Sequence, residues 1–323
     1  MKFIDLFSGI GGFRLALEKF NHDCVFSADF DKYACDTYEK NFNEYPLIDI
    51  QEMSEKKIPN HDILCAGFPC QPFSLAGKRQ GFEDVRGTLF FDIARILKEK
   101  KPKIFLLENV KGLINHDKGR TFRKILNILS SKINGLENMQ EKENLGYNVF
   151  WKVLNTKDFN LPQNRERVFI VGFKNQTIKF EFPKKKKLVK ELSEIIEKKP
   201  AEIKKMTKLS FEYVKKYLKK HKEYQKIKDL KYLVANEVRK SRCNFHFKNI
   251  SPCLTTKMGT GGNNVPYLVN YNRFFSINEC LALQGFPKNF KLTRNYSEAL
   301  KQIGNTVTVP LVESIIKEIS LKV

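Results

Sequence analysis

Short apolar runs alternate with amphipathic stretches along the first half of the chain. Four runs have the length and residue types of buried strands: Phe3–Leu6, Cys24–Ala28, Ile63–Ala66 and Ile104–Leu107. Apolar residues at helical spacing, or further strand-like runs, occur at Phe13–Phe20, Leu89–Leu97, Trp151–Leu154, Arg167–Val171 and Pro310–Ile319. This alternation predicts an α/β fold with a doubly wound, mostly parallel sheet and helices on both faces.

The pattern changes after Phe173. Leu188–Tyr232 is rich in Lys, Glu and Tyr at helical spacing, which indicates a separate, smaller lobe. From Asn249 the chain is rich in Thr, Gly and Asn, and Gly259–Asn264 is typical of a mobile loop near a ligand or a DNA backbone. We therefore expect a second domain beside the one that contains the sheet.

Composition adds a core and an anionic partner to this picture. With 323 residues, 41% of them hydrophobic, the chain can bury a sizeable core, which excludes a mainly disordered protein. The 58 basic against 36 acidic residues give a net charge of +22, which favours nucleic acid as a partner over a general excess of lysine only if the charge is clustered. Residues 184–231 contain 18 lysines, no arginine and 7 acids, half of the whole excess, and this clustering indicates a binding surface.

The cysteines point away from disulfides and metals. There are seven, without a C-x-x-C pair and without a spacing that matches the five histidines, so we expect neither a disulfide scaffold nor a zinc site. The first residues lack a long apolar segment, and charges or glycines interrupt every apolar run. A cytoplasmic protein with reduced thiols is expected.

A glycine-rich loop, Phe7–Gly12, follows the first expected strand and precedes a helix. Glycines there let a ligand approach the backbone, but Arg14 stands where a dinucleotide fingerprint needs glycine. Asp29, about 20 residues on at the end of the second strand, is placed to hold a ribose. Asp49 follows at the expected end of a third strand. From these residues alone, a nucleoside-type cofactor and a tight turn with surface acids both remain open.

Cys70 lies in the segment Gly67–Ser74, directly after a buried strand. The carboxyl end of a parallel strand is where such folds bind ligands, and backbone N–H groups there stabilise a thiolate. We favour a nucleophile over a small buried apolar side chain at this position. The apolar role is expected for the other six cysteines, Cys24, Cys35, Cys65, Cys243, Cys253 and Cys280.

Three further polar groups are candidates for chemistry. Glu108 ends a buried strand on the same edge of the sheet, where burial raises a carboxyl pKa and lets it donate a proton, although a solvated strand-end acid is equally consistent. Arg165 and Arg167 alternate on an expected strand and so share a face, either to fix an anion or base carbonyl or as an ordinary ion-paired edge. Gly304–Pro310 opens the last expected helix, with Asn305 and Thr306 as candidate caps, and capping alone would explain these two residues.

Taken together and in this order, these motifs resemble the cytosine-C5 DNA methyltransferases, in particular the small bacterial type II modification enzymes. The resemblance covers residues 1–173 and 273–323, with Phe7–Gly12 as the cofactor motif, Cys70 in the nucleophile motif and Glu108 in the acid motif. It implies an S-adenosylmethionine-dependent, Rossmann-like catalytic domain (1–173 plus 271–323) and a smaller target-recognition domain (174–270), where the lysines are densest.

The resemblance also implies site residues. Phe7 and Phe30 would sandwich the adenine. Asp29 would hold the ribose hydroxyls, and Asp49 would hold the adenine edge. The full cofactor set would be Phe7, Ser8, Gly9, Gly11, Gly12, Asp29, Phe30, Asp49, Ile50, Pro69, Leu89, Asn305 and Val307. The catalytic set would be Cys70, Glu108, Arg165 and Arg167, and the candidates for DNA contact are Gln71, Ser74, Arg239, Arg242, Lys257 and Thr260.

The implied reaction explains these residue types. A Cys70 thiolate adds to C6 of cytosine, so that C5 attacks the methyl group of S-adenosylmethionine, which becomes S-adenosylhomocysteine. Glu108 holds N3, Arg165 holds the base carbonyl, and the base must leave the DNA stack. The expected partners are double-stranded DNA and a cognate restriction endonuclease, with no membrane, for a monomer in the bacterial cytoplasm at the nucleoid.

Three other classes stay in view. The tRNA-directed branch of the same family usually has a Cys-Phe-Thr tripeptide, whereas here Cys243 precedes Asn244 and Cys253 precedes Leu254. A basic DNA-binding protein with an inactive methyltransferase half is disfavoured by the intact Cys70, Glu108 and Arg165, because a decayed site should have lost at least one of them. A generic thiol enzyme or a nicotinamide dehydrogenase accounts for one motif each and leaves the rest unused.

Overall fold

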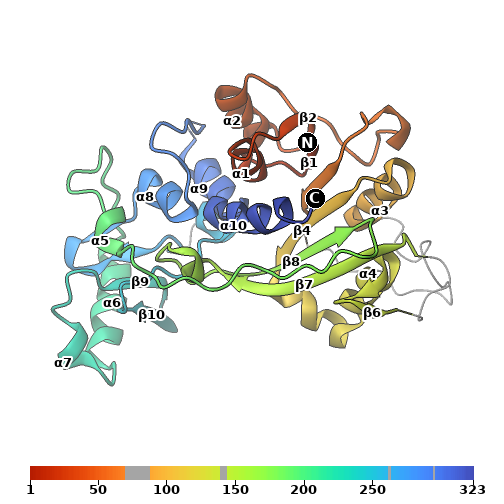
Figure 1. The fold of residues 1–323 in the computed structure, drawn as a ribbon. Coiled ribbons are helices and arrows are strands. Elements are labelled where there is room, and N and C mark those ends of the chain that lie inside the picture. Colours follow the sequence, from red (N-terminus) through yellow and green to blue (C-terminus); the bar gives the residue numbers. More distant parts are fainter. Residues whose placement is uncertain (70–87, 139–143, 261–262, 294) are drawn as a thin grey trace. The chain divides into compact units, whose positions relative to one another are not determined.

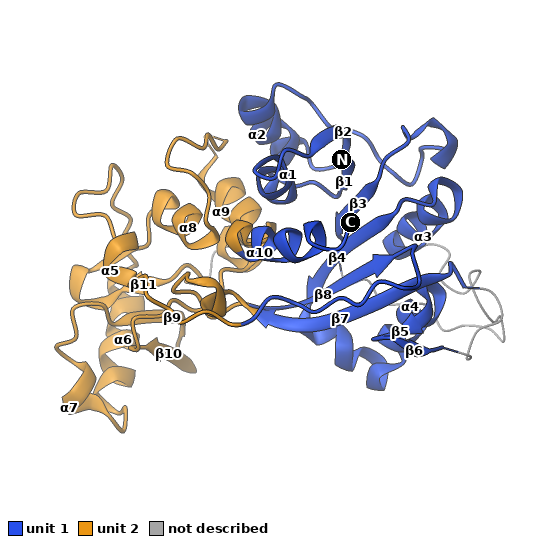
Figure 2. Cartoon of the chain, in the orientation of Figure 1, with its two compact units in different colours: residues 1–154, 166–184, 311–323 blue, residues 155–165, 185–310 orange. Residues whose placement is uncertain are grey.

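The computed structural model describes residues 1–69, 88–138, 144–260, 263–293 and 295–323 (Figure 1). These residues form two compact units (Figure 2). The first unit comprises residues 1–154, 166–184 and 311–323, and the second comprises residues 155–165 and 185–310.

An eight-stranded sheet runs through the first unit. Its strands are β1 (Lys2–Leu6), β2 (Asp23–Ala28), β3 (Ile63–Gly67), β4 (Ile104–Val110), β5 (Ser130–Ile133), β6 (Leu136–Glu137), β7 (Tyr147–Asn155) and β8 (Glu166–Phe173). Their order is β2-β1-β3-β4-β8-β7-β5-β6; β1 is parallel to β2 and β3, β3 is parallel to β4, and β8 is antiparallel to β4. This confirms the predicted doubly wound, mostly parallel sheet. The strand order reverses between β1 and β3, where folds of this kind bind ligands at the carboxyl ends.

Helices of the first unit cover the sheet. They are α1 (Gly12–Glu18), α2 (Lys32–Phe42), α3 (Leu89–Lys100), α4 (Arg120–Leu129) and α10 (Val309–Ser320), with the 3-10 helices η1 (Glu55–Lys57) and η3 (Lys111–Gly119). Side chains at the N-cap positions determine where two of these helices begin. Asp31 accepts from two backbone N–H groups at the start of α2, and Thr88 from the N–H of Phe91 at the start of α3.

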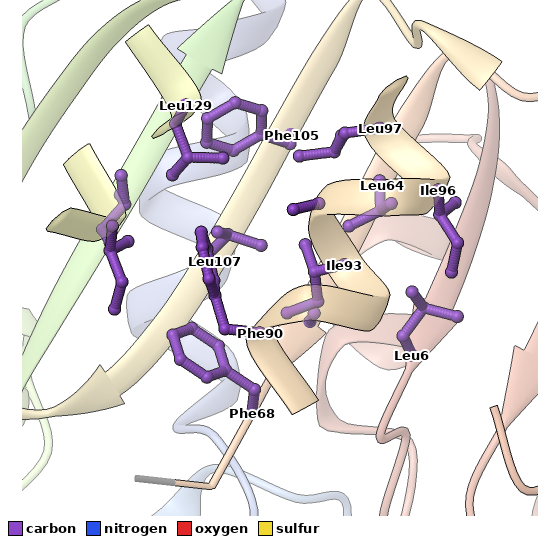
Figure 3. Packing of buried hydrophobic residues seen from close by; sticks show 14 of the residues in the cluster. Leu6, Leu64, Phe68, Phe90, Ile93, Ile96, Leu97, Phe105, Leu107 and Leu129 are labelled. Atoms are coloured by element: carbon purple, nitrogen blue, oxygen red, sulfur yellow. The ribbon is translucent and has the colours of Figure 1, made fainter. Parts of the chain in front are cut away.

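The main core lies between the sheet and α3 (Figure 3). Residues alternate along β1, so that Ile4 and Leu6 enter this core while Phe3 and Asp5 point to the opposite face. Phe68, directly after β3, packs against Phe90 of α3 with the ring centroids 5.9 Å apart. Each of these large apolar side chains contributes about 1.5–3 kcal/mol by leaving water. The core therefore fixes the end of β3, from which Cys70 follows.

The second unit has its own sheet and core. Its strands β9 (Val234–Arg239), β10 (Arg242–His246), β11 (Tyr267–Leu268) and β12 (Arg273–Phe274) form an antiparallel sheet in the order β10-β9-β11-β12. Its helices are α5 (Leu192–Ile195), α6 (Lys208–Lys219), α7 (Tyr224–Ile227), α8 (Ile277–Gln284) and α9 (Tyr296–Asn305), with the 3-10 helices η4 (Thr156–Phe159), η5 (Thr256–Thr260) and η6 (Val269–Tyr271). Val214 of α6, Ala235 of β9 and Tyr267 of β11 are buried together.

Residues 155–165 and 271–310 group with this second unit rather than with the large sheet. The domain bounds expected from sequence, 1–173 plus 271–323 and 174–270, were drawn by function and not by packing. The assignment of DNA reading to residues 174–270 stays a prediction. Among the helices that the structure describes, none is long and apolar enough to cross a membrane.

Two local expectations are wrong. No regular strand precedes Asp49. Leu47 makes a single parallel bridge with Asp29, in which the N–H of Asp29 donates to the Pro46 carbonyl and the N–H of Ile48 donates to the Asp29 carbonyl. Asn305 does not open the last helix. It is the last residue of α9, the chain then becomes extended at Thr306, and α10 begins at Val309.

A close contact at Gly172 gives a test of the sheet. Gly172 of β8 pairs with Phe105 of β4, and a Cβ built on it would lie 2.1 Å from the ring of Phe105, which is fully buried against Tyr147. We expect Gly172→Ala to lower the free energy of unfolding by about 1–3 kcal/mol, because the ring has nowhere to move.

The matched control is Gly112→Ala in η3, where the nearest atom to a new Cβ would be 4.0 Å away. Urea denaturation of the two variants measures the difference. Equal stabilities would contradict the close packing of β4 on β8.

Candidate active site

The loop after β1 is held in a strained but hydrogen-bonded form. Phe7, Gly9 and Gly11 have positive φ angles of 54°, 53° and 82°. The N–H of Ser8 donates to the carbonyl of Ala28 (3.1 Å), and the N–H of Gly9 donates to Oδ2 of Asp29 (2.7 Å). The end of β2 therefore fixes the loop that follows β1.

A second support comes from α1 and α2. A Cβ on Gly11 would lie 2.3 Å from the ring of Phe42, so that only glycine fits there. Arg14 lies over the rings of Tyr38 and Phe42 and donates to the hydroxyl of Tyr38. Its guanidinium also forms ion pairs with Glu18 and Glu44. These contacts hold the first turn of α1 against α2.

Asp5 is a buried acid below this loop. Its side chain is fully buried, and neither carboxyl oxygen has a hydrogen-bond partner. Burial raises the pKa of Asp5 well above its usual range; the charge of Arg14 opposes this rise, whereas Asp29 and Glu44 add to it. The neutral, protonated carboxyl is therefore favoured in the folded protein.

Several residues that we expect to bind a nucleoside lie at or near the ends of β1 and β2. Asp29 is buried, and its Oδ1 accepts from the N–H of Asp31 (2.8 Å). Burial raises the pKa of Asp29, whereas the N–H groups of Asp31 and Gly9 lower it. The ring of Phe30 is 67% exposed, Asp49 is exposed, and Ile50 is buried.

The cradle fits a nucleoside-type group. The hydroxyl of Ser8 is buried without a hydrogen-bond partner, and a Cβ on Gly9 would meet nothing within 4 Å. Asp29 retains acceptor capacity beside them, and the face of Phe30 is open to a flat ring. Leu89 of the same set is buried and Pro69 is exposed, whereas Asn305 and Val307 belong to the second unit.

Glu108 lies beside the end of β3, which leads into the segment that contains Cys70. It is in register with Gly67, the last residue of β3. The side chain of Asn109 donates to the carbonyl of Phe68 (2.8 Å), a role that the sequence motif did not reveal. Nε of Arg167 lies 3.1 Å from Oε1 of Glu108, and both side chains are largely buried. An acid and a cation thus meet next to the start of the nucleophile motif.

Three predicted site residues, Cys70, Gln71 and Ser74, lie outside the described residues. Of the other cysteines, Cys35, Cys65 and Cys280 are buried as expected and Cys24, Cys243 and Cys253 are half-buried. Burial raises the pKa of the Cys24 thiol to about 11 and that of Cys243 to about 12, so both stay protonated at neutral pH. The described residues contain no group of His, Cys, Asp or Glu side chains suited to a metal.

Arg165 and Arg167 do not share a face, which corrects the expectation from sequence. β8 begins only at Glu166, so the alternation of a strand does not apply to Arg165. The guanidinium of Arg165 donates to the backbone carbonyls of Leu254 (2.6 Å) and Thr306 (2.7 Å). Arg167, in contrast, faces Glu108.

The candidates for DNA contact come together in the second unit. Arg239 and Arg242 are paired across the β9–β10 hairpin, and Arg242 forms an ion pair with Glu237. Arg239 donates to Oδ1 of Asn264 (3.4 Å), and the amide of Asn264 donates to the carbonyl of Lys257 (3.1 Å). The hydroxyl of Thr260 donates to the same carbonyl (3.0 Å). Asn264 thus joins the hairpin to η5, which its polar loop sequence did not indicate.

The fold is α/β, with an acid–arginine pair at the carboxyl end of its sheet and, at the ends of β1 and β2, residues whose chemistry suits a nucleoside. Residues 1–321 match the family described as C-5 cytosine-specific DNA methylase. The chain belongs to this family, and it is a DNA cytosine-5-methyltransferase. Such an enzyme needs a methyl donor and acts on DNA.

Curated relatives match over nearly the whole chain. The Type II methyltransferase M.NgoBI of Neisseria gonorrhoeae is 44% identical over 99% of this chain and 93% of its own. M.HaeII of Haemophilus aegyptius is also 44% identical, over 97% and 91%. M.HhaI of Haemophilus parahaemolyticus is 38% identical, over 98% and 93%.

Solved structures share the fold at low identity. A DNMT2 mutant of Spodoptera frugiperda superposes with a TM-score of 0.70 at 21% identity, covering 99% of both chains. A DNA modification methyltransferase encoded within an Escherichia coli prophage, described as putative in its own name, gives 0.69 at 19% identity, covering 100% of this chain and 99% of its own. These similarities support the fold assignment.

The buried Asp5 predicts a pH dependence of stability. Because its folded pKa is raised above the unfolded value, its contribution to stability is complete below the unfolded pKa and is lost as pH rises through the folded pKa. We expect Asp5→Asn to be increasingly more stable than the wild type between pH 5 and pH 8 in urea denaturation.

Asp62→Asn is the control. The pKa of Asp62 is lowered by its hydrogen bond to Lys103, so this acid is ionised in both states over the same range and the difference from wild type stays constant. A pH-independent difference for Asp5→Asn would show that Asp5 does not titrate as described.

Proposed function

We propose that this enzyme methylates C5 of a flipped-out cytosine in a specific DNA sequence, through a covalent Cys70 adduct and with S-adenosylmethionine as the donor. The observation that carries the proposal is the pairing of Glu108 with Arg167 beside the root of the Cys70 segment. A largely buried carboxylate and guanidinium at the carboxyl end of a parallel sheet are suited to orient a polar ligand, because such groups cluster at functional sites.

S-adenosylmethionine would supply an electrophilic methyl group. In the first unit, Asp29 would accept hydrogen bonds from the ribose hydroxyls, and the exposed ring of Phe30 would pack on the adenine. The unpartnered hydroxyl of Ser8 and the open space above Gly9 leave room for the amino-acid part. Asp49, Ile50, Leu89, Asn305 and Val307 complete the proposed set.

Cys70 is proposed as the nucleophile. Its thiolate would form a bond to C6 of the cytosine, and the electrons of the 5,6 double bond would shift to C5. C5 would then take the methyl group from the sulfonium sulfur of the donor, whose S–CH3 bond breaks so that S-adenosylhomocysteine leaves. The C5 proton is then lost to a base, the electron pair restores the double bond, and the C6–sulfur bond breaks to release the thiolate. C6 is accessible only from above the ring plane, so the base must leave the stack.

Glu108 and Arg167 would hold the pyrimidine edge during these steps. Protonation or hydrogen bonding of N3 by Glu108 withdraws electrons and favours attack at C6. Arg167, held 3.1 Å from Glu108, is better placed than Arg165 to donate to the neighbouring base carbonyl, because Arg165 donates to the backbone carbonyls of Leu254 and Thr306. Arg167 therefore replaces Arg165 in this proposed role.

Residues 174–270 are proposed to read the DNA target. The hairpin arginines and η5 present Arg239, Arg242, Lys257 and Thr260 in one hydrogen-bonded group, and arginine is well suited to base edges. Fifteen of the 18 lysines in residues 184–231 are exposed and suit phosphates.

The relatives named Type II methyltransferases support a place beside a restriction endonuclease. Methylation of a cytosine in the target would then protect host DNA from cleavage. We propose a monomer that acts on the nucleoid in the bacterial cytoplasm, since a single set of site residues needs no symmetry.

Bisulfite sequencing tests the reaction. Unmethylated genomic DNA is incubated with the purified protein and S-adenosylmethionine, and we expect protected cytosines in one short recurring sequence. Cys70→Ser should abolish protection while duplex binding persists, because the hydroxyl is a far weaker nucleophile. Protection by Cys70→Ser would refute the covalent route, and transfer of tritiated methyl to tRNA but not to DNA would refute the substrate.

The lysine-rich helix α6 predicts a salt effect. Replacing the exposed Lys216, Lys219 and Lys220 with Gln should reduce the slope of log Kd against log salt by about 2–3, because each phosphate contact contributes about 0.9. Fluorescence anisotropy with a duplex of the methylated sequence measures the slope.

The charge-matched control replaces three exposed lysines of the first unit, Lys40, Lys317 and Lys322, with Gln. An equal loss of slope in both triple variants would mean that net charge, and not α6, determines binding.

A further inference from the structure

Arg165 forms a buried clamp within the second unit. Its side chain is 2% exposed, and its two terminal nitrogens donate to three backbone carbonyls. Nη1 lies 2.6 Å from the Leu254 oxygen and 3.2 Å from that of Gly304. Nη2 lies 3.2 Å from the Gly304 oxygen and 2.7 Å from that of Thr306. One rigid guanidinium thus joins two chain segments about 50 residues apart.

Gln163 makes a parallel connection. It is fully buried, its oxygen accepts from the N–H of Leu254 (3.1 Å), and its nitrogen donates to the carbonyl of Leu283 (2.8 Å). The next side chain in the network, Gln284, donates to the Ile303 carbonyl (2.8 Å) and accepts from the Thr308 hydroxyl (3.0 Å). The same two segments are therefore fixed on both sides of Leu254.

Two glycines let these segments touch. A Cβ on Gly304 would lie 2.2 Å from the carbonyl carbon of Thr255 and 2.4 Å from the nitrogen of Thr256. A Cβ on Gly259 would lie 2.5 Å from the Ser297 oxygen in α9. η5 is thus packed backbone to backbone along α9, and Gly259 is fixed rather than part of an open loop.

We propose that Arg165 and Gln163 are positioning residues that make η5 and the end of α9 one rigid element. η5 presents the exposed Lys257 and Thr260, and α9 ends at the exposed Asn305. The inference rests on the proposed function, in which Lys257 and Thr260 contact DNA and Asn305 belongs to the cofactor set. Contact of η5 with DNA then fixes the segment around Asn305.

Lysine cannot replace this arginine. A guanidinium donates in a planar fork to several carbonyls at once, whereas an ammonium is a single point on a flexible stem. Arg165→Lys keeps the charge but loses part of the clamp. The variant therefore isolates the geometry of the connection from the presence of a buried cation.

Arg273→Lys is the matched control. Arg273 is also a buried arginine of the second unit, paired with Glu279 and donating to the carbonyls of Phe274 and Glu197. It connects α8 with the residues that follow α5, and among the described residues it bonds to no group of η5 or α9. The cost of replacing a buried arginine is thus shared by the two variants, but the location differs.

Hydrogen–deuterium exchange of the full chain without DNA or cofactor is the first measurement. We expect Arg165→Lys to raise exchange at least threefold in residues 254–260 and in residues 303–306 together, while Arg273→Lys leaves both segments within twofold of wild type. Unchanged exchange in either segment of Arg165→Lys would overturn the proposal, whether or not the enzyme methylates DNA.

Single-turnover methyl transfer to unmethylated plasmid DNA is the second measurement. At saturating DNA and S-adenosylmethionine, we expect at least a tenfold lower rate for Arg165→Lys, a KM for DNA within threefold, and a rate within threefold of wild type for Arg273→Lys. Equal losses in the two variants would overturn the proposal, because they would indicate general destabilisation. An inactive wild type would refute the proposed function and leave the exchange result standing.

A milder variant serves if Arg165→Lys does not fold. Thr308→Val removes the hydroxyl that bonds Gln284 and Thr156, with little change of volume. We expect a threefold to tenfold lower single-turnover rate with raised exchange in residues 303–306. Wild-type rate and exchange in this variant would overturn the proposal.

Discussion

The hydrogen-bond register of β4 with its two neighbours determines the geometry of the active-site edge. On one side Glu108 is paired with Gly67, the last residue of β3, and on the other with Phe169 of β8. A shift by one residue would turn the Glu108 side chain to the other face of the sheet. The apolar residues of β4 make such a shift costly, because Leu107 would leave the main core. Packing of the sheet therefore fixes where the acid lies.

Beyond the ends of the strands, single polar side chains take over this role. Asn109 fixes Phe68, Asp29 fixes Gly9, and Arg95 of α3 donates to the carbonyl of Ile50. Each bond contributes only about 1 kcal/mol to stability, but each restricts a segment that has no sheet pairing of its own. The segments around the candidate site are therefore ordered by a few side-chain bonds to backbone groups. This explains why acids and amides stand directly after the strands.

The sequence predicts what depends on local pattern and misses what depends on the partner segment. Asp29 and Glu108 were found because strand ends are visible as the limits of apolar runs. The family resemblance assigns Arg165 to the base carbonyl, and the alternation with Arg167 predicts a shared face, but β8 begins one residue after Arg165. The three carbonyls that accept from Arg165 are 89 to 141 residues away in the chain. Asn264 was missed for the same reason, since its partners Arg239 and Lys257 come from two separate elements.

In the proposed function, lysines and arginines have different roles in DNA binding, and their positions in the chain differ accordingly. Residues 184–231 carry lysine and no arginine, and lysine is a strongly hydrated point charge that suits phosphates of any sequence. Among the described residues, the arginines of the second unit stand elsewhere, at the hairpin and in buried clamps, where a planar fork fixes direction. Long-range attraction depends on charge alone and tolerates flexible stems, whereas a base edge or a backbone carbonyl requires fixed geometry. Specificity should therefore follow the arginines and their amide neighbours, and affinity the lysines.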